Sequence, residues 1–137
     1  MKRYAILSFA LSVAFLLATV LPAAATSKHP FRGNWKGLDT WDDSNITYRI
    51  VEEARSGGKV FEIRGTDDRT GGWCGGGPAT LKAIGVLEEE NYIVLSLVWT
   101  CLAADHNVLY FLSDTFTYDP STDTITDSTG GIFHRER

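Results

Sequence analysis

Residues 91–102 read NYIVLSLVWTCL, which is the longest apolar run outside the N-terminus and the stretch that decides the fold. Ile93 and Leu95 alternate with Val94 and Ser96, the period-two pattern of a β-strand. Both faces of this strand carry apolar residues. We therefore expect a central strand that is either covered on both sides or part of a barrel wall.

This run contains Cys101, one of only two cysteines in the chain. The other is Cys74, which lies in the glycine-rich stretch 71–78, GGWCGGGP. Two cysteines in an exported chain indicate one disulfide, with two free thiols as the alternative. Closure of the segment between them would stabilise the fold by about 3 kcal/mol. We expect this disulfide to hold the glycine-rich loop, including Trp73, against the long strand.

The N-terminus has the features of a secretory signal peptide. Two basic residues precede the apolar segment 4–21, a proline breaks it, and three alanines ending at Ala25 form an Ala-x-Ala cleavage site. An uncleaved membrane anchor is the alternative, because the 18 residues of this segment nearly match the ~20 that span a membrane. We expect a signal-peptide helix over 1–25, secretion to the extracellular space or the periplasm after cleavage, and one β-barrel domain over 26–137.

The mature chain of 112 residues fits a single domain. Its 11 basic and 17 acidic residues give a net charge of −6 with neutral histidines. Neither a phosphate backbone nor an anionic membrane surface attracts an acidic protein, so we expect no nucleic-acid partner and no membrane partner after signal cleavage.

The scattered histidines and two cysteines lack the spacing of a zinc site, and we expect no metal or cofactor. We expect a monomer.

Seven other segments carry strand signals separated by turn-forming residues. Alternation of apolar and polar residues predicts strands over 31–35, 45–51, 60–64, 79–87, 108–118, 124–127 and 132–135. We expect a bulge near Ser113 and Asp114, where the alternation slips, and an exposed loop over 66–72. The chain is therefore predicted to be all-β, an up-and-down antiparallel barrel of about eight strands, because closure removes exposed strand edges. A two-sheet sandwich is the alternative.

Gly33-Asn34-Trp35, together with Arg135 near the C-terminus, resembles the calycin superfamily, the eight-stranded barrels that include lipocalins, fatty-acid-binding proteins and avidins. In those families the Gly-x-Trp of the first strand lies at the closed end of the barrel, and an arginine of the last strand packs over the indole. The resemblance implies these structural roles for Gly33, Trp35 and Arg135, with Arg137 as an alternative arginine. The chain also resembles small exported bacterial proteins of unknown function in the order of its motifs, which are FRGNW (31–35), DDS (42–44), CGGGPA (74–79), WTC (99–101) and DSTGGIFHR (127–135).

Small antiparallel barrels bind ligands in the lumen or at the open mouth. Six aromatic residues are candidates to line such a cavity: Tyr48, Phe61, Trp73, Trp99, Phe111 and Phe116. The alternative is that they fill a solid core. We therefore expect a secreted binding protein for a small hydrophobic molecule, without catalysis. A connected apolar cavity of about 300 Å³ or more would distinguish the two cases.

A second hypothesis places function on the surface loops. The glycine-rich loop with Trp73 and the turn with Trp41 each present a tryptophan on flexible backbone. Such a chain would be an exported module that binds or inhibits an extracellular protein, by fold-level analogy with the bacterial metalloprotease inhibitors.

Two polar clusters have residue types that could support chemistry. The acidic turn offers oxygen ligands for calcium but lacks the regular alternation of a calcium loop; its members are Asp39, Asp42 and Asp43. One group has the residue types of a nucleophile with a base: Ser113, Asp114 and His106. Common polar residues near a loop are weak support for calcium binding or for catalysis. We therefore expect the acidic turn to be solvated without a metal ion, and we expect the protein not to be an enzyme.

Overall fold

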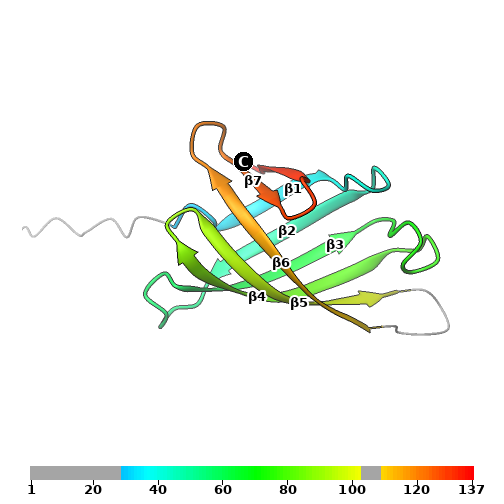
Figure 1. The fold of residues 1–137 in the computed structure, drawn as a ribbon, viewed down its shortest axis with the longest axis horizontal. Helices are drawn as coiled ribbons and strands as arrows, with labels where there is room; N and C mark the ends of the chain where they lie inside the picture. The colour runs from blue at the N-terminus through cyan, green and yellow to red at the C-terminus, as the bar shows by residue number, and fades with distance from the viewer. Residues whose placement is uncertain (1–28, 103–108) are drawn as a thin grey trace, which may run out of the picture.

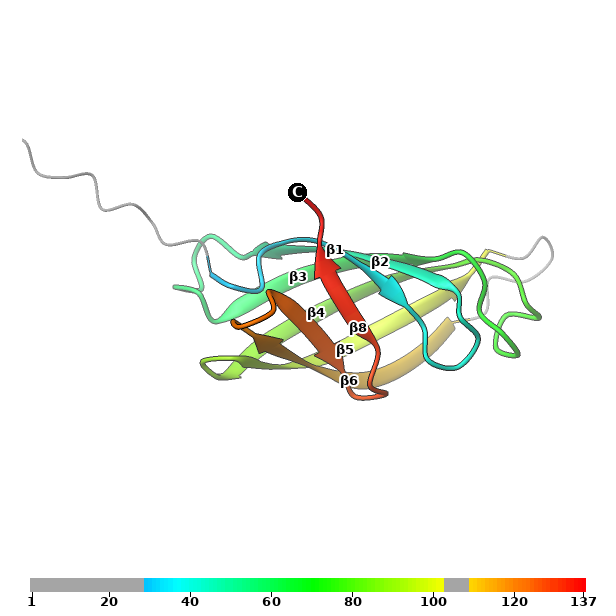
Figure 2. The ribbon, with the colours of Figure 1, turned by 90° about the horizontal axis from the view of Figure 1, so that it is seen from above.

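The computed structural model describes residues 29–102 and 109–137, so the predicted signal peptide lies outside the described residues. Eight strands form a closed barrel in which each strand pairs antiparallel with the next and the last returns to the first (Figures 1 and 2). The strands are β1 (Gly33–Leu38), β2 (Asn45–Glu52), β3 (Val60–Asp67), β4 (Ala79–Glu89), β5 (Tyr92–Cys101), β6 (Leu109–Asp119), β7 (Thr124–Asp127) and β8 (Ile132–Arg135). The predicted all-β, eight-stranded antiparallel barrel is confirmed.

The apolar strand β5 is a wall of this barrel. Ile93, Leu95 and Leu97 point inward and are buried, whereas Val94 on the outer face is 36% exposed. The outer face of β5 is therefore open to solvent, and the barrel-wall interpretation holds rather than a strand covered on both sides.

The predicted bulge near Ser113 and Asp114 is wrong. The ladder between β5 and β6 keeps one register throughout, and Asp114 stands opposite the inward-facing Leu95. The alternation of apolar and polar residues breaks at this point because a carboxylate occupies an inward position of the strand. A register shift occurs instead between β4 and β5, at Leu87 and Glu89.

One end of the barrel is closed by Trp35 and Arg135. Trp35 is fully buried, and its indole N–H donates to the carbonyl oxygen of Phe31 at 2.8 Å. The guanidinium carbon of Arg135 lies 4.1 Å from the centroid of the Trp35 ring. A Cβ atom on Gly33 would come within 2.7 Å of Arg135 Nη1, so a larger residue would displace the guanidinium, and the φ of +150° at this position also favours glycine. Gly33, Trp35 and Arg135 thus meet in the arrangement that the resemblance to calycins implies.

Arg135 also binds the chain around it through hydrogen bonds. Its Nε donates to the two carboxylate oxygens of Asp123 at 3.0 and 3.1 Å. Its Nη1 and Nη2 donate to the carbonyl oxygens of Arg32 and Pro30, each at 2.5 Å. One side chain therefore joins β8, the turn between β6 and β7, and the segment that enters β1.

Aromatic side chains fill this half of the barrel. The rings of Phe31 and Phe61 lie 6.0 Å apart between centroids. Nearer the middle, the Tyr48 ring packs 5.0 Å from Phe116 and 4.8 Å from Phe133. This last group forms a layer across the barrel, which we call the aromatic floor (Tyr48, Phe116 and Phe133).

Arg135→Leu is expected to lower the free energy of unfolding by about 2–3 kcal/mol, because it removes the cation over Trp35 and leaves Asp123 without its partner. Urea unfolding followed by tryptophan fluorescence measures this change. The matched control is Arg137→Leu, which removes an exposed charge two residues away and should change stability by less than about 0.5 kcal/mol. Equal effects of the two substitutions would contradict the structural role of Arg135.

Candidate functional site

A cavity of about 360 Å³ lies at the end of the barrel opposite Trp35. The turn after β1 and the loop after β3 meet at this end (Figure 1), which we call the mouth. Nine apolar or aromatic residues line the cavity: Trp41, Ile46, Tyr48, Trp73, Ala79, Leu97, Trp99, Tyr110 and Leu112. Five carboxylates line it as well: Asp39, Asp42, Asp67, Asp114 and Asp127. Since Tyr48 belongs to the aromatic floor, the filled half of the barrel ends where the cavity begins.

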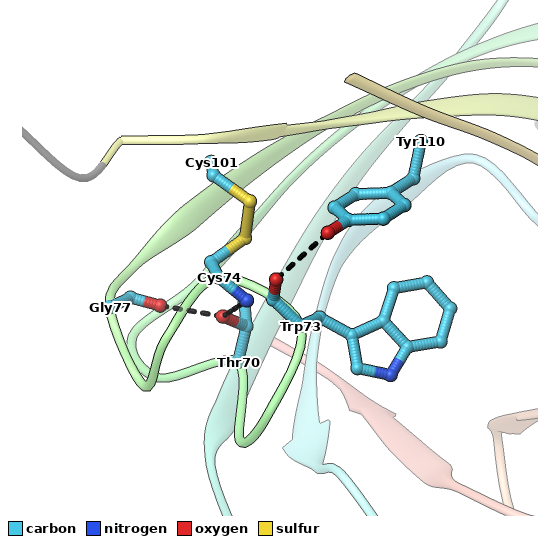
Figure 3. The surroundings of a disulfide bond; sticks show 6 residues. All are labelled: Thr70, Trp73, Cys74, Gly77, Cys101 and Tyr110. Atoms are coloured by element: carbon cyan, nitrogen blue, oxygen red, sulfur yellow. Dashed lines mark hydrogen bonds between the residues drawn. A yellow bond between two sulfur atoms is a disulfide. The ribbon is translucent and has the colours of Figure 1, made fainter. Parts of the chain in front are cut away.

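The predicted disulfide between Cys74 and Cys101 is confirmed, and it ties the glycine-rich loop to the end of β5 (Figure 3). The Cα atoms of the two cysteines are 5.4 Å apart. Within the loop, the Thr70 hydroxyl accepts a hydrogen bond from the Cys74 amide at 3.1 Å and donates to the Gly77 carbonyl at 2.8 Å. The loop therefore has internal hydrogen bonds in addition to its covalent link.

Trp73 is positioned at the rim by Tyr110 of β6. The Tyr110 hydroxyl donates to the carbonyl oxygen of Trp73 at 2.9 Å, and the two ring centroids lie 5.3 Å apart (Figure 3). Because both residues line the cavity, this contact fixes one side of the mouth.

Three of the six aromatic residues proposed as cavity lining are found there: Tyr48, Trp73 and Trp99. Phe116 lies one layer below, against Tyr48 in the aromatic floor. Phe61 does not line the cavity, because it is fully buried beside Phe31 in the closed half.

Phe111 is also outside the cavity. It is 75% exposed and pairs with Val98 on the outer surface of the barrel. Its neighbours Tyr110 and Leu112 face the cavity, and side chains alternate along a strand, so Phe111 must face outward. Sequence alone did not reveal this, since apolar residues occupy both faces of β6.

The cavity carboxylate Asp67 was predicted to lie in an exposed loop. It is instead the last residue of β3, and its side chain is 4% exposed. The signal was present in the sequence, because Asp67 continues the inward alternation of Phe61, Ile63 and Gly65. A Cβ atom at Gly65 would lie 2.8 Å from the Tyr48 ring, so glycine lets that ring pack against β3.

Burial at the mouth shifts the acidity of three side chains. Desolvation raises the pKa of Asp67 above its ordinary value, and the charges of Asp42 and Asp39 add to the rise. Desolvation likewise raises the pKa of Asp127. The pKa of the Tyr48 phenol is raised well above its ordinary value, first by burial and then by four cavity carboxylates, Asp127, Asp114, Asp39 and Asp67. The mouth thus holds negative charge in a partly dehydrated space.

No basic side chain lines the cavity among the described residues. The two ion pairs found in residues 29–102 and 109–137 are Arg64–Glu62 and Arg135–Asp123, and neither involves a cavity carboxylate. Arg69 is exposed near the start of the loop after β3, and its guanidinium donates to the backbone carbonyl of Asp42. The carboxylates are therefore not neutralised by salt bridges within the described chain.

The acidic turn after β1 uses its carboxylates as turn acceptors. Asp39 Oδ1 accepts from the Trp41 amide at 2.7 Å, and Asp42 Oδ1 accepts from the Ser44 amide at 3.0 Å. In the part of the chain that the structure describes, no three His, Cys, Asp or Glu side chains come together in a group able to hold a metal ion.

The structure describes two of the three residues predicted as a nucleophile with a base. Ser113 and Asp114 are consecutive in β6, so their side chains point to opposite sides of the strand. His106 lies outside the described residues.

Comparison of the chain with protein-family models, curated proteins and solved structures gives no significant match. Within the described ranges, no helix has the length and apolar character needed to cross a membrane.

Asp67→Asn is expected to stabilise the protein at neutral pH, because burial raises the pKa of Asp67 and its charge therefore opposes folding. The folded state holds this proton more tightly than the unfolded state does. Wild-type stability should then improve, relative to the variant, as the pH falls through the folded-state pKa toward the ordinary carboxyl value of about 4. Urea unfolding at several pH values measures the difference.

The neighbouring Asp68 provides a control of opposite sign. Hydrogen bonds from the side chain and backbone of Asn45, at 2.7 and 2.8 Å, lower the pKa of Asp68. Asp68→Asn should therefore destabilise the protein at neutral pH, and this loss should disappear as the pH falls below the ordinary carboxyl value. An Asp67→Asn variant that is less stable than wild type at neutral pH would contradict the assignment of Asp67 as a buried charge.

Proposed function

We propose that this protein binds a small apolar molecule in the cavity at the mouth of the barrel. The observation that carries the proposal is the cavity itself. Its volume of about 360 Å³ falls within the range of ligand pockets, which begins near ~300 Å³. Its walls are mainly apolar, with Trp99 and Leu97 from β5 and Leu112 from β6. A few polar groups set in such walls are typical of small-molecule sites.

The arrangement around the cavity favours binding without large rearrangement. The aromatic floor closes it from below, and the disulfide and the Tyr110 hydrogen bond hold the Trp73 loop at its rim. A site that is formed before the ligand arrives loses less conformational entropy on binding.

We further propose that the protein is exported, with cleavage near Ala25, and that it is a calycin-like carrier that acts as a monomer without catalysis. The disulfide supports an extracellular or periplasmic location, since such bonds persist in oxidising compartments. The stacking of Arg135 on Trp35 supports the calycin-like assignment, because it reproduces the contact on which the resemblance rests.

The alternative proposal is an exported module that binds or inhibits a protein through its mouth loops. It is favoured by the 76% exposure of Trp41, since exposed tryptophans are common anchors of protein interfaces. If the protein acts through its mouth loops, a substitution that fills the cavity should leave binding of the protein partner intact. If it is a carrier, the same substitution should weaken binding of the small molecule.

A cavity-filling substitution tests the carrier proposal. Leu112→Trp adds volume at an exposed position of the cavity wall and should weaken binding of the neutral apolar dye Nile red by about tenfold or more. Fluorescence titration of the dye measures this loss.

Phe111→Ala is the matched control, because it alters the adjacent residue on the outer surface and should leave dye affinity unchanged. Circular dichroism is used to check that each variant is folded. If Phe111→Ala removed dye binding and Leu112→Trp did not, the dye would bind the outer wall and the carrier proposal would fail.

A further inference from the structure

We propose that the ligand of the mouth cavity carries a positive charge, as an apolar molecule with an amine or quaternary ammonium group. This inference rests on the proposed binding function and names the chemical class of the ligand. It starts from charge complementarity, since five carboxylates and no basic side chain of the described residues line the cavity. A charge in a partly dehydrated site interacts with its neighbours more strongly than it would in bulk water.

Two of the carboxylates reach the cavity from opposite walls of the barrel. Asp67 comes from β3 and Asp114 from β6, with β4 and β5 between them in the sheet. Asp67 Oδ1 accepts from the Arg69 amide at 3.0 Å, and Asp114 Oδ1 accepts from the Ser128 amide at 3.1 Å. These hydrogen bonds orient the two carboxylates but bring no positive charge to them. A cationic ligand between β3 and β6 would bring that charge.

Tyr48 provides an observation that does not depend on the carboxylates. Its side chain is 4% exposed and lines the cavity, yet its hydroxyl takes part in none of the hydrogen bonds found between described residues. The phenol group is therefore available to a molecule bound in the cavity. The phenol oxygen can accept a hydrogen bond from an ammonium N–H or contact the methyl groups of a quaternary ammonium.

The aromatic walls suit the same ligand. Trp73, Trp99 and Tyr110 line the cavity beside the carboxylates, and the faces of such rings attract organic cations. Ile46 and Leu97 offer apolar contact for an uncharged body. An inorganic cation would gain little from these walls, so the combination selects an organic one.

Probes that share a benzyl-type body and differ in charge test this inference. Benzyltrimethylammonium and 2-phenylethylammonium are cationic, neopentylbenzene is the uncharged isostere of the first, and phenylmethanesulfonate is anionic. Their affinities are measured by direct calorimetric titration of the folded protein at neutral pH. We expect at least one of the two cations to bind about tenfold more tightly than neopentylbenzene. The anionic sulfonate should bind more weakly than that cation and more weakly than neopentylbenzene.

Removal of one cavity charge tests where the cation sits. Asp67→Asn and Asp114→Asn should each weaken binding of the preferred cation by about fivefold or more, while the affinity of neopentylbenzene stays the same. Asp68→Asn removes an equal charge from the adjacent exposed position and should not change the preference for the cation. Thermal unfolding of each variant confirms that it is folded.

The outcomes separate this inference from the proposed function. Equal or tighter binding of the neutral probe would overturn the cationic ligand but leave the apolar carrier standing. The cationic ligand would also be overturned if Asp68→Asn lowered the preference for the cation as much as Asp67→Asn did. The preference would then come from the net charge of the protein and not from the cavity. If neither Nile red nor any of the probes bound, the proposed function itself would fail.

Discussion

The structure depends on the closure of the sheet, because β8 must return to β1 for every strand to be paired on both sides. That closing ladder is short, with only three residue pairs between Trp35↔Arg135 and Gly37↔Phe133. Arg135 reinforces it by stacking on Trp35 and by donating hydrogen bonds to Asp123 and to the chain before β1. Closure removes the open edges that an eight-stranded meander would otherwise expose.

The barrel is filled by side chains at one end and contains a cavity at the other. Aromatic side chains fill the barrel from Trp35 up to the floor formed by Tyr48, Phe116 and Phe133, and above that floor lies the cavity. The disulfide and the loop it holds belong to the mouth, so the covalent link supports the candidate site rather than the filled half. Asp67 is buried and accepts a hydrogen bond from the Arg69 amide, but it has no cationic partner among the described residues, so its charge opposes folding.

Sequence patterns predicted the fold well because apolar and polar residues alternate clearly in several strands, such as β2, β3 and β4. The strand count, the closed topology, the disulfide and the contact of Arg135 with Trp35 could all be anticipated. The site was predicted less completely, for two physical reasons. Apolar residues lie on both faces of β6, so the sequence could not show that Phe111 points outward. Aspartate is typical of exposed loops, so the sequence did not predict that Asp67 and Asp114 point into the barrel. Both nevertheless continue the alternation of their strands.

We propose that the open half of the barrel holds a small molecule. Native mass spectrometry of the protein purified from its own source tests this most directly. We predict a complex with one small molecule that is released when the protein unfolds and that carries an amine or quaternary ammonium group. A bare chain that also fails to take up any of the small apolar probes, or a complex with a second protein in place of a small molecule, would contradict the account.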